Sequence, residues 1–159
     1  MQFAVSVNPD PAASSATSAT PSRFIFLAIA VLAVAGIAVS EVSLERHYAK
    51  SKTAFCDFGE RFNCDIVNRS EYSSVMGIPV ASIGIVGYGV LLALATVCRS
   101  RGETPTRLLV AAVAGLGFAL YLTYVEAYVL ETWCILCLSS LGLIAGITVL
   151  AGVVRARAS

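Results

Sequence analysis

Four long apolar stretches constrain the fold of this chain more than any other feature. Each approaches the ~20 residues that a helix needs to cross a ~30 Å hydrocarbon core. Only helices or closed barrels satisfy their backbone hydrogen bonds inside lipid, so we expect an all-α membrane protein built as a four-helix bundle. Hydrophobic residues make up 57% of the 159 residues, more than a soluble domain of this length can bury. The expected helices cover about 23–44, 80–97, 108–128 and 133–154.

The remaining segments complete the organisation of the chain. Residues 1–22 are rich in Ala, Ser, Thr and Pro, which predicts a disordered tail, and 155–159 form a short basic tail. The first apolar stretch resembles a signal-peptide core, but no basic segment precedes it, which favours a retained helix. The connection at 129–132 is so short that we expect the last two helices to pair as an antiparallel hairpin. One domain, 23–154, is therefore expected.

Five cysteines are many for a membrane chain of this size, and their positions divide them. With four membrane-spanning helices, the polar loop at 41–79 and the turn at 129–132 lie on the same side of the membrane. Two cysteines fall in that loop and two at the start of the last helix, whereas Cys98 falls at the opposite side, where we interpret it as an inert core thiol. The four that gather at one face are Cys56, Cys64, Cys134 and Cys137.

The basic residues give a mild preference for one orientation. The termini and the connection at 98–107 carry six arginines, against five basic residues in the 41–79 loop, and those six lie near helix ends, where they count most. Both termini are therefore expected in the cytoplasm. The four cysteines then face an oxidising compartment, the periplasm side of a cell inner membrane or, in a eukaryote, a lumen. The net charge of +1 gives no argument for a nucleic-acid partner.

The segment WCILC places Cys134 and Cys137 three residues apart at the start of the last helix. At this spacing they point to one face and are close enough to form a disulfide after a small adjustment. Backbone N–H groups and the helix dipole stabilise a thiolate within the first turn, so Cys134 should have the lower pKa. Cys137 lies one turn deeper, facing an apolar interior that a lipid-soluble oxidant such as a quinone can reach.

The segment CDFGERFNC contains the second pair, Cys56 and Cys64. Seven intervening residues, with Gly59 among them, predict a flexible loop that can meet a soluble partner and then the Cys134 pair. An exposed pair and an embedded pair suggest a relay that carries two electrons from thiols in water to a quinone in the membrane.

Three other interpretations of the cysteines stay open. They can be small hydrophobic residues of the helix core, or static structural disulfides in a non-enzymatic membrane protein. Zinc is a third possibility, but the seven-residue spacing of the loop pair is a poor match to the usual short spacings of zinc ligands, so we expect no metal.

These residues together resemble the vitamin K epoxide reductase family over about residues 24–154. The resemblance rests on the four helices, the loop pair and WCILC at the start of helix four. The segment 64–88 is similar to bacterial members, in which a serine, here Ser70, lies six residues after the second loop cysteine, and a stretch like GIPVASIG leads into helix two.

The resemblance implies a bundle around a quinone, capped by the cysteine loop and a short horizontal helix. It also implies that Cys137 reduces the quinone (ubiquinone or menaquinone) and that Cys134 exchanges with a loop cysteine, Cys64. Cys56 then meets a separate thioredoxin-fold (DsbA-like) partner that oxidises folding proteins, and Ser70 supports the site by hydrogen bonding. The implied function is a quinone-dependent thiol–disulfide oxidoreductase that supports disulfide bond formation.

Three departures from relatives refine this expectation. Many bacterial relatives carry a fused thioredoxin-like domain, whereas this sequence ends at Ser159, so a separate partner is expected. Vertebrate members have an aromatic residue where Asn68 stands and a tyrosine where Leu141 stands. An ordinary membrane quinone is therefore expected in place of vitamin K epoxide, although a vitamin K (epoxide) reductase proper stays an alternative.

Other polar residues are less specific. Tyr121, Tyr124 and Tyr128 share one face of the third helix, and Tyr124 or Tyr128 could hydrogen-bond a quinone carbonyl, although we favour an aromatic belt at the membrane interface. Glu126, near a helix end, is expected to reach water. His47, the only histidine, is expected to be a solvated loop residue.

Overall fold

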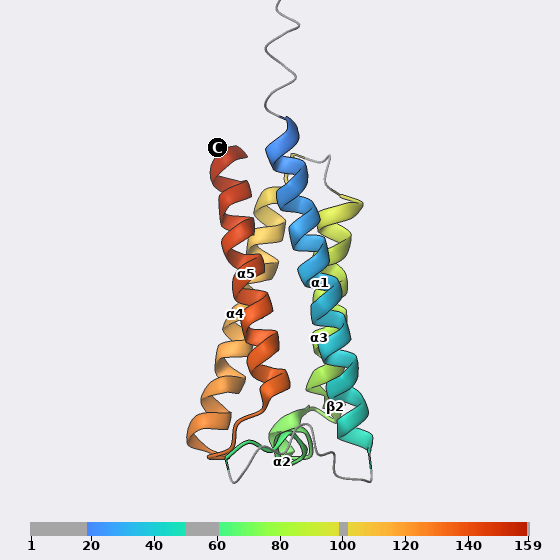
Figure 1. The fold of residues 1–159 in the computed structure, drawn as a ribbon, viewed down its shortest axis with the longest axis vertical. Helices are drawn as coiled ribbons and strands as arrows, with labels where there is room; N and C mark the ends of the chain where they lie inside the picture. Colours follow the sequence, from blue (N-terminus) through green and yellow to red (C-terminus); the bar gives the residue numbers. More distant parts are fainter. Residues whose placement is uncertain (1–18, 50–60, 99–101, 159) are drawn as a thin grey trace, which may run out of the picture.

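The computed structural model of the chain describes residues 19–49, 61–98 and 102–158, and these residues are mostly helical. Figure 1 shows the long helices side by side, with the short elements gathered across one end of them. The long helices are α1 (Ala19–Tyr48), α3 (Val80–Thr96), α4 (Thr104–Tyr128) and α5 (Ile135–Ala158). The short elements are α2 (Cys64–Asn68), the 3₁₀ turn η3 (Glu71–Ser73), β1 (Ser74–Val75) and β2 (Ile78–Pro79).

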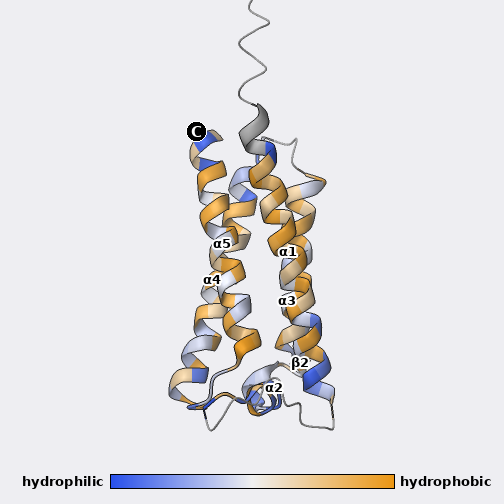
Figure 2. Ribbon diagram, viewed as in Figure 1, coloured by the Kyte–Doolittle hydropathy of each residue, from blue (hydrophilic) through white to orange (hydrophobic). Residues whose placement is uncertain are grey.

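Three of the long helices are long and apolar enough to cross a membrane, namely α1 from Arg23, α4 and α5. Helix α3 is also apolar but has 17 residues, a length of about 25 Å at 1.5 Å per residue, which is short of a ~30 Å hydrocarbon core. Figure 2 shows apolar residues along most of each long helix and polar residues concentrated at the two ends. The chain is therefore a helical membrane protein, as its composition indicates.

The helices differ from the expected ones mainly at their ends. Helix α1 continues to Tyr48, so the polar segment after it is shorter than expected. Helix α4 begins at Thr104, four residues early, because Pro105 fits the first helical turn, where its missing N–H is not needed. Helix α5 begins at Ile135, two residues later than expected.

The bundle is assembled around α1, which packs mainly against α3 and α5, while α4 packs mainly against α5. The close packing of α4 on α5 confirms the predicted hairpin, and Figure 1 shows the two helices running antiparallel. Its core includes Ile29, Leu108 and Ile147, which are fully buried. A Cβ atom on Gly36 would lie 2.4 Å from the ring of Tyr88, so this glycine lets the tyrosine lie against α1.

The short elements cover one end of the bundle and are held by local hydrogen bonds. The Asn63 side chain caps α2 by accepting from the N–H groups of Asp65 and Ile66, each at 3.1 Å. Strands β1 and β2 form a hairpin whose turn residues Met76 and Gly77 have φ values of 53° and 83°. Positive φ at both turn positions is the geometry of a tight two-residue hairpin turn.

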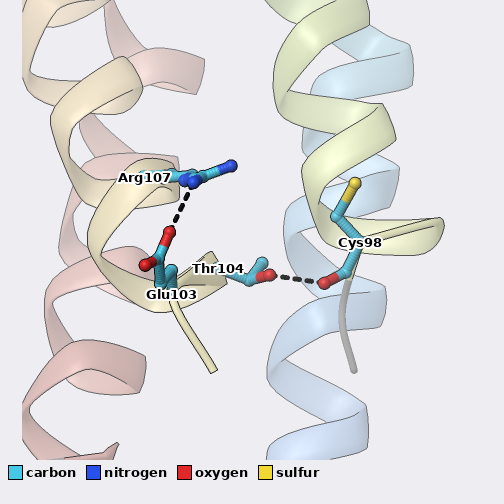
Figure 3. Close-up of polar contacts among 4 residues, drawn as sticks. All are labelled: Cys98, Glu103, Thr104 and Arg107. Atoms are coloured by element: carbon cyan, nitrogen blue, oxygen red, sulfur yellow. Dashed lines mark hydrogen bonds and ion pairs between the residues drawn. The ribbon is translucent and has the colours of Figure 1, made fainter. Parts of the chain in front are cut away.

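At the other end, α3 is joined to α4 by a short connection. Figure 3 shows the Thr104 hydroxyl donating to the Cys98 carbonyl oxygen, and the Arg107 guanidinium paired with the Glu103 carboxylate. Cys98 is a half-buried free thiol in this region. It lies far along the bundle from the short elements, as the sequence predicts.

Candidate functional site

Two backbone hydrogen bonds join the segment before α2 to the segment before α5. The Trp133 N–H donates to the Arg61 carbonyl at 2.8 Å, and the Asn63 N–H donates to the Trp133 carbonyl at 3.2 Å. They form an isolated parallel bridge between Phe62 and Trp133. Because Cys64 and Cys134 each follow one of these segments directly, the bridge brings the two cysteines to the same place.

Cys64 and Cys134 lie in one buried cluster, with exposed fractions of 1% and 0%. Val67 completes this cluster, and Cys137 packs against it. The structure therefore brings together three of the four predicted site cysteines. Cys56, the fourth, lies outside the described residues.

The cysteines of the site differ in oxidation state. Cys64 is disulfide-bonded, and its partner is not among the described residues. Cys134 and Cys137 are free thiols. An oxidised loop cysteine thus lies in the same cluster as a reduced thiol that is able to attack a disulfide.

The Asn68 side chain links the two cysteines. This side chain is buried, and its Nδ2 group donates to the Cys64 carbonyl at 3.0 Å and to Cys134 Sγ at 3.9 Å. In the sequence, Asn68 is notable only as a departure from vertebrate relatives, and its role beside Cys134 was not predicted. The available signal was a polar residue four positions after a cysteine, one helical turn away.

Cys134 lies directly before α5 instead of inside it, which corrects the expected placement of both cysteines on the helix. Its carbonyl accepts from the Leu138 N–H at 3.0 Å, so Cys134 takes the cap position. A hydrogen bond from the Cys137 thiol lowers the pKa of Cys134 most. The N–H groups of Cys137 and Leu136 lower it further, against burial and the nearby charge of Glu126. The lowered pKa agrees with the expected stabilisation of a Cys134 thiolate.

A cavity of about 430 Å³ lies among the four long helices and reaches Cys137. Its volume is in the range of small-molecule sites, which are mostly apolar with a few polar groups. The lining has this character, because every long helix contributes apolar residues, among them Val39, Val90, Phe118 and Leu136. Cys137 thus faces an apolar interior, as predicted from its position one turn deeper.

Tyr88 is a polar group of the cavity wall that sequence analysis missed. Its hydroxyl donates to the Ser140 carbonyl at 2.9 Å and lies 2.9 Å from the Ser140 hydroxyl oxygen. Both residues line the cavity. A tyrosine within an apolar helix, opposite a glycine on another helix, was the signal available, but recognising it requires the pairing of α1 with α3.

Tyr124 and Tyr128, the tyrosines predicted to contact a quinone, do not line the cavity. Their exposed fractions are 58% and 73%, and their rings pack against each other with centroids 4.8 Å apart. Tyr121 is also exposed. The spacing of these residues shows that they share a face but not which face meets the interior, and the observed exposure fits the aromatic-belt interpretation.

His47 and Ser70 line the cavity close to α2. His47 Nδ1 lies 2.5 Å from the Asn68 carbonyl oxygen, which can only accept, so Nδ1 carries the proton. The expectation of a solvated histidine is therefore wrong, because α1 extends far enough to bring His47 against α2. The Ser70 hydroxyl donates to the Val67 carbonyl at 2.8 Å and so holds the end of α2.

Glu126 is buried, with an exposed fraction of 2%, so the expectation that it reaches water is wrong. The turn after α4 folds back over it, and the Thr132 N–H donates to the Glu126 carbonyl at 3.2 Å. Its carboxylate Oε2 accepts from the Cys134 N–H at 3.1 Å. Glu126 also lines the cavity, next to Cys137.

Within residues 19–49, 61–98 and 102–158, no group of three or more His, Cys, Asp or Glu side chains is arranged to hold a metal ion. The comparison with protein families gives a match to the model described as the Vitamin K epoxide reductase family, over residues 27–151. The match covers most of the chain, including the cysteine loop, the cavity and the WCILC segment.

Proposed function

The chain belongs to the vitamin K epoxide reductase family of membrane thiol–disulfide oxidoreductases, and from this premise we propose that it passes electrons from a thiol partner to a membrane quinone. In this proposal the electrons enter at Cys56 and Cys64, move to Cys134 and Cys137, and leave to the quinone. The product is an oxidised partner, which supports disulfide bond formation in other proteins.

One observation carries the proposal. Cys64 and Cys134 share a buried cluster, while Cys137, three residues further on, lines the apolar cavity. Thiol–disulfide exchange requires contact between the reacting sulfurs, and the lowered pKa of Cys134 favours its release as a thiolate when the loop disulfide re-forms. A relay would use these groups in the order in which they lie, from the loop cysteine to Cys134, then to Cys137 and the cavity.

The cavity fits a quinone head group in size and chemistry. A quinone supplies the capacity to accept two electrons and two protons from a dithiol. The apolar walls suit its ring, and the Ser140 hydroxyl, which lies 2.9 Å from the Tyr88 hydroxyl, is a suitable donor for a ring carbonyl. Ser70 would stabilise the α2 end of the cavity.

The membrane setting completes the proposal. We place all four long helices across the cell inner membrane. The short α3 begins directly after β2, at the end of the bundle that α2 and the β hairpin cover. The cysteine face then meets the periplasm and the termini lie in the cytoplasm, as the distribution of arginines favours. The partner is a separate thioredoxin-fold protein that reaches the loop through Cys56.

The test is quinone reduction by the purified protein in detergent, with a reduced thioredoxin-fold protein as the thiol donor and a soluble ubiquinone or menaquinone analogue as the acceptor. We expect Cys134→Ala and Cys137→Ala each to lower turnover at least 100-fold, because each removes a required sulfur. Cys98→Ala is the matched control and should keep turnover within about twofold, because Cys98 is not among the described residues that line the cavity and lies at the other end of the bundle from the site cysteines.

Three results would contradict the proposal. Wild-type turnover in both Cys134→Ala and Cys137→Ala would exclude an electron relay through these cysteines. Cysteines that stay oxidised whatever the state of the quinone, seen by alkylation and gel shift, favour a non-enzymatic protein with structural disulfides. Faster reduction of vitamin K epoxide than of either quinone analogue identifies a vitamin K epoxide reductase proper.

A further inference from the structure

Glu126 is the one acidic side chain that lines the cavity in the described part of the chain. Its exposed fraction of 2% is low for a carboxylate, since burying a charge in an apolar bundle is costly. A buried acid in a membrane bundle is by default a functional group, because its cost needs compensation.

The two carboxylate oxygens of Glu126 have different surroundings. Oε2 accepts from the Cys134 N–H at 3.1 Å. Oε1 is buried and makes no directed hydrogen bond to the described residues. The carboxyl group interacts electrostatically with the Cys137 thiol, and both groups line the cavity. One oxygen therefore holds the carboxyl group in place, and the other is available beside the thiol that faces the cavity.

We propose that Glu126 transfers a proton from the Cys137 thiol to the quinone oxygen. This inference rests on the proposed function and assigns a role that the four cysteines leave open. A thiol is a poor electron donor until it loses its proton, and the largely apolar walls around Cys137 disfavour the release of that proton without a nearby acceptor.

The overall reaction balances with Glu126 as a carrier. The Cys134 and Cys137 thiols together lose two protons and two electrons as their S–S bond forms, and the quinone gains both to become the hydroquinone. The Glu126 carboxylate takes the proton of the Cys137 S–H bond and later gives it to a quinone oxygen, so it ends in its starting state. The second proton, from Cys134, is released to water at the cysteine end of the bundle as its thiolate forms at the cap of α5, and the second quinone oxygen takes its proton from water.

The other titratable groups near the cavity are less suited to this role. From α1, His47 lines the cavity close to α2, where its Nδ1 donates to the Asn68 carbonyl. Tyr72 of η3 and Tyr88 of α3 also line it, and the Tyr88 hydroxyl is bonded to Ser140. Among the acids and bases of the described cavity wall, Glu126 is the one whose charge acts on the Cys137 thiol.

The test compares Glu126→Gln with Glu131→Gln in the intact protein. A glutamine at 126 retains an oxygen that accepts from the Cys134 N–H but cannot carry a proton. We expect E126Q to reduce quinone analogue about 100-fold more slowly, the low end of the effect of general acid–base catalysis. E131Q removes an exposed carboxylate five residues away and should keep the wild-type rate.

Two further readouts separate proton transfer from a structural role. Reduction of Cys134 and Cys137 by the thiol donor, without quinone, should be the same in E126Q and wild type. The wild-type rate of quinone reduction should reach a plateau as Glu126 ionises with rising pH. The E126Q rate should instead rise ~tenfold per pH unit, because the thiol must ionise unaided.

A wild-type rate and plateau in E126Q would overturn the inference, and so would an equal loss of thiol exchange and quinone reduction. If E126Q fails to fold, Glu126→Asp is the test variant. Its shorter carboxyl group should lower the rate of quinone reduction but keep the plateau of that rate at high pH. A rate that rises with pH without a plateau would contradict the inference. A wild-type protein that reduces no quinone analogue refutes the proposed function itself, whereas E126Q failing its prediction refutes only the role of Glu126.

Discussion

The two ends of the bundle each contain cysteines, but only one end is built for cysteine chemistry. At the Cys98 end, the Thr104 hydroxyl bonds the Cys98 backbone carbonyl (Figure 3), and the half-buried thiol is not among the described residues that line the 430 Å³ cavity. At the other end, Cys134 has thiol and amide donors, a second cysteine and a buried carboxylate around it. The comparison shows that the neighbouring donors, thiols and charges, and not the cysteine itself, determine whether a thiol is suited to redox chemistry.

Removing one hydrogen-bonding side chain at each end should give the largest contrast. Asn68→Ala removes the amide that joins the Cys64 carbonyl to Cys134 Sγ. We expect electron transfer from the loop to Cys134 to slow about tenfold, the effect of about 1.4 kcal/mol from one buried hydrogen-bonding group. Stopped-flow measurement of thiol exchange with the reduced partner gives this rate.

Thr104→Val is the control for this prediction, because it also removes one buried hydrogen-bonding group, at the Cys98 end. It should lower the melting temperature slightly and leave the exchange rate unchanged. Equal slowing of exchange in the two variants would mean that the effect comes from general destabilisation, and the contrast between the ends would not hold.

A smaller effect is expected inside the cavity. Tyr88→Phe keeps the ring against Gly36 but removes the hydroxyl that lies 2.9 Å from Ser140. We expect the KM for a quinone analogue to rise about fivefold, which corresponds to about 1 kcal/mol, with little change in kcat. Tyr124→Phe, which removes an exposed hydroxyl, is the matched variant. A larger rise in KM for Tyr124→Phe than for Tyr88→Phe would mean that Tyr124, as predicted from the sequence, contacts the quinone.

The smallest expected effect is on stability as a function of pH. The pKa of Cys134 is lowered in the folded protein, so this thiol binds protons less tightly there than in the unfolded chain. Its contribution to stability is full above the ordinary thiol pKa and is lost as pH falls through the lowered value. Wild type should therefore lose slightly more stability than Cys134→Ser over this window, measured by thermal unfolding at a series of pH values. Parallel curves would show that Cys134 has no stabilised thiolate.

The elements of the fold that depend on local pattern were predictable. Long apolar runs identified α1, α4 and α5, because the membrane thickness converts directly into helix length. The short turn predicted the α4–α5 hairpin, and the position of Cys134 near a helix start predicted its lowered pKa. Each of these depends on residues close together in the sequence.

The site residues that were missed depend on contacts between distant segments. Asn68 acts on Cys134 only because the Phe62–Trp133 bridge joins the two segments. Glu126 is buried only because the following turn covers it. Helical spacing groups residues on a face without orienting that face, so the sequence drew attention to Tyr124 and not to Tyr88, which lines the cavity.

The sequence by itself determined that this protein is a helical membrane protein with cysteines gathered at one face, because bilayer thickness and chain connectivity act on local composition and order. Only the tertiary structure decided what surrounds those cysteines. The cavity at Cys137, the cluster of Cys64 with Cys134 and the carboxylate of Glu126 all arise from side chains on different helices. Their chemistry depends on burial and on distances of a few ångströms, and these are set by how the helices pack.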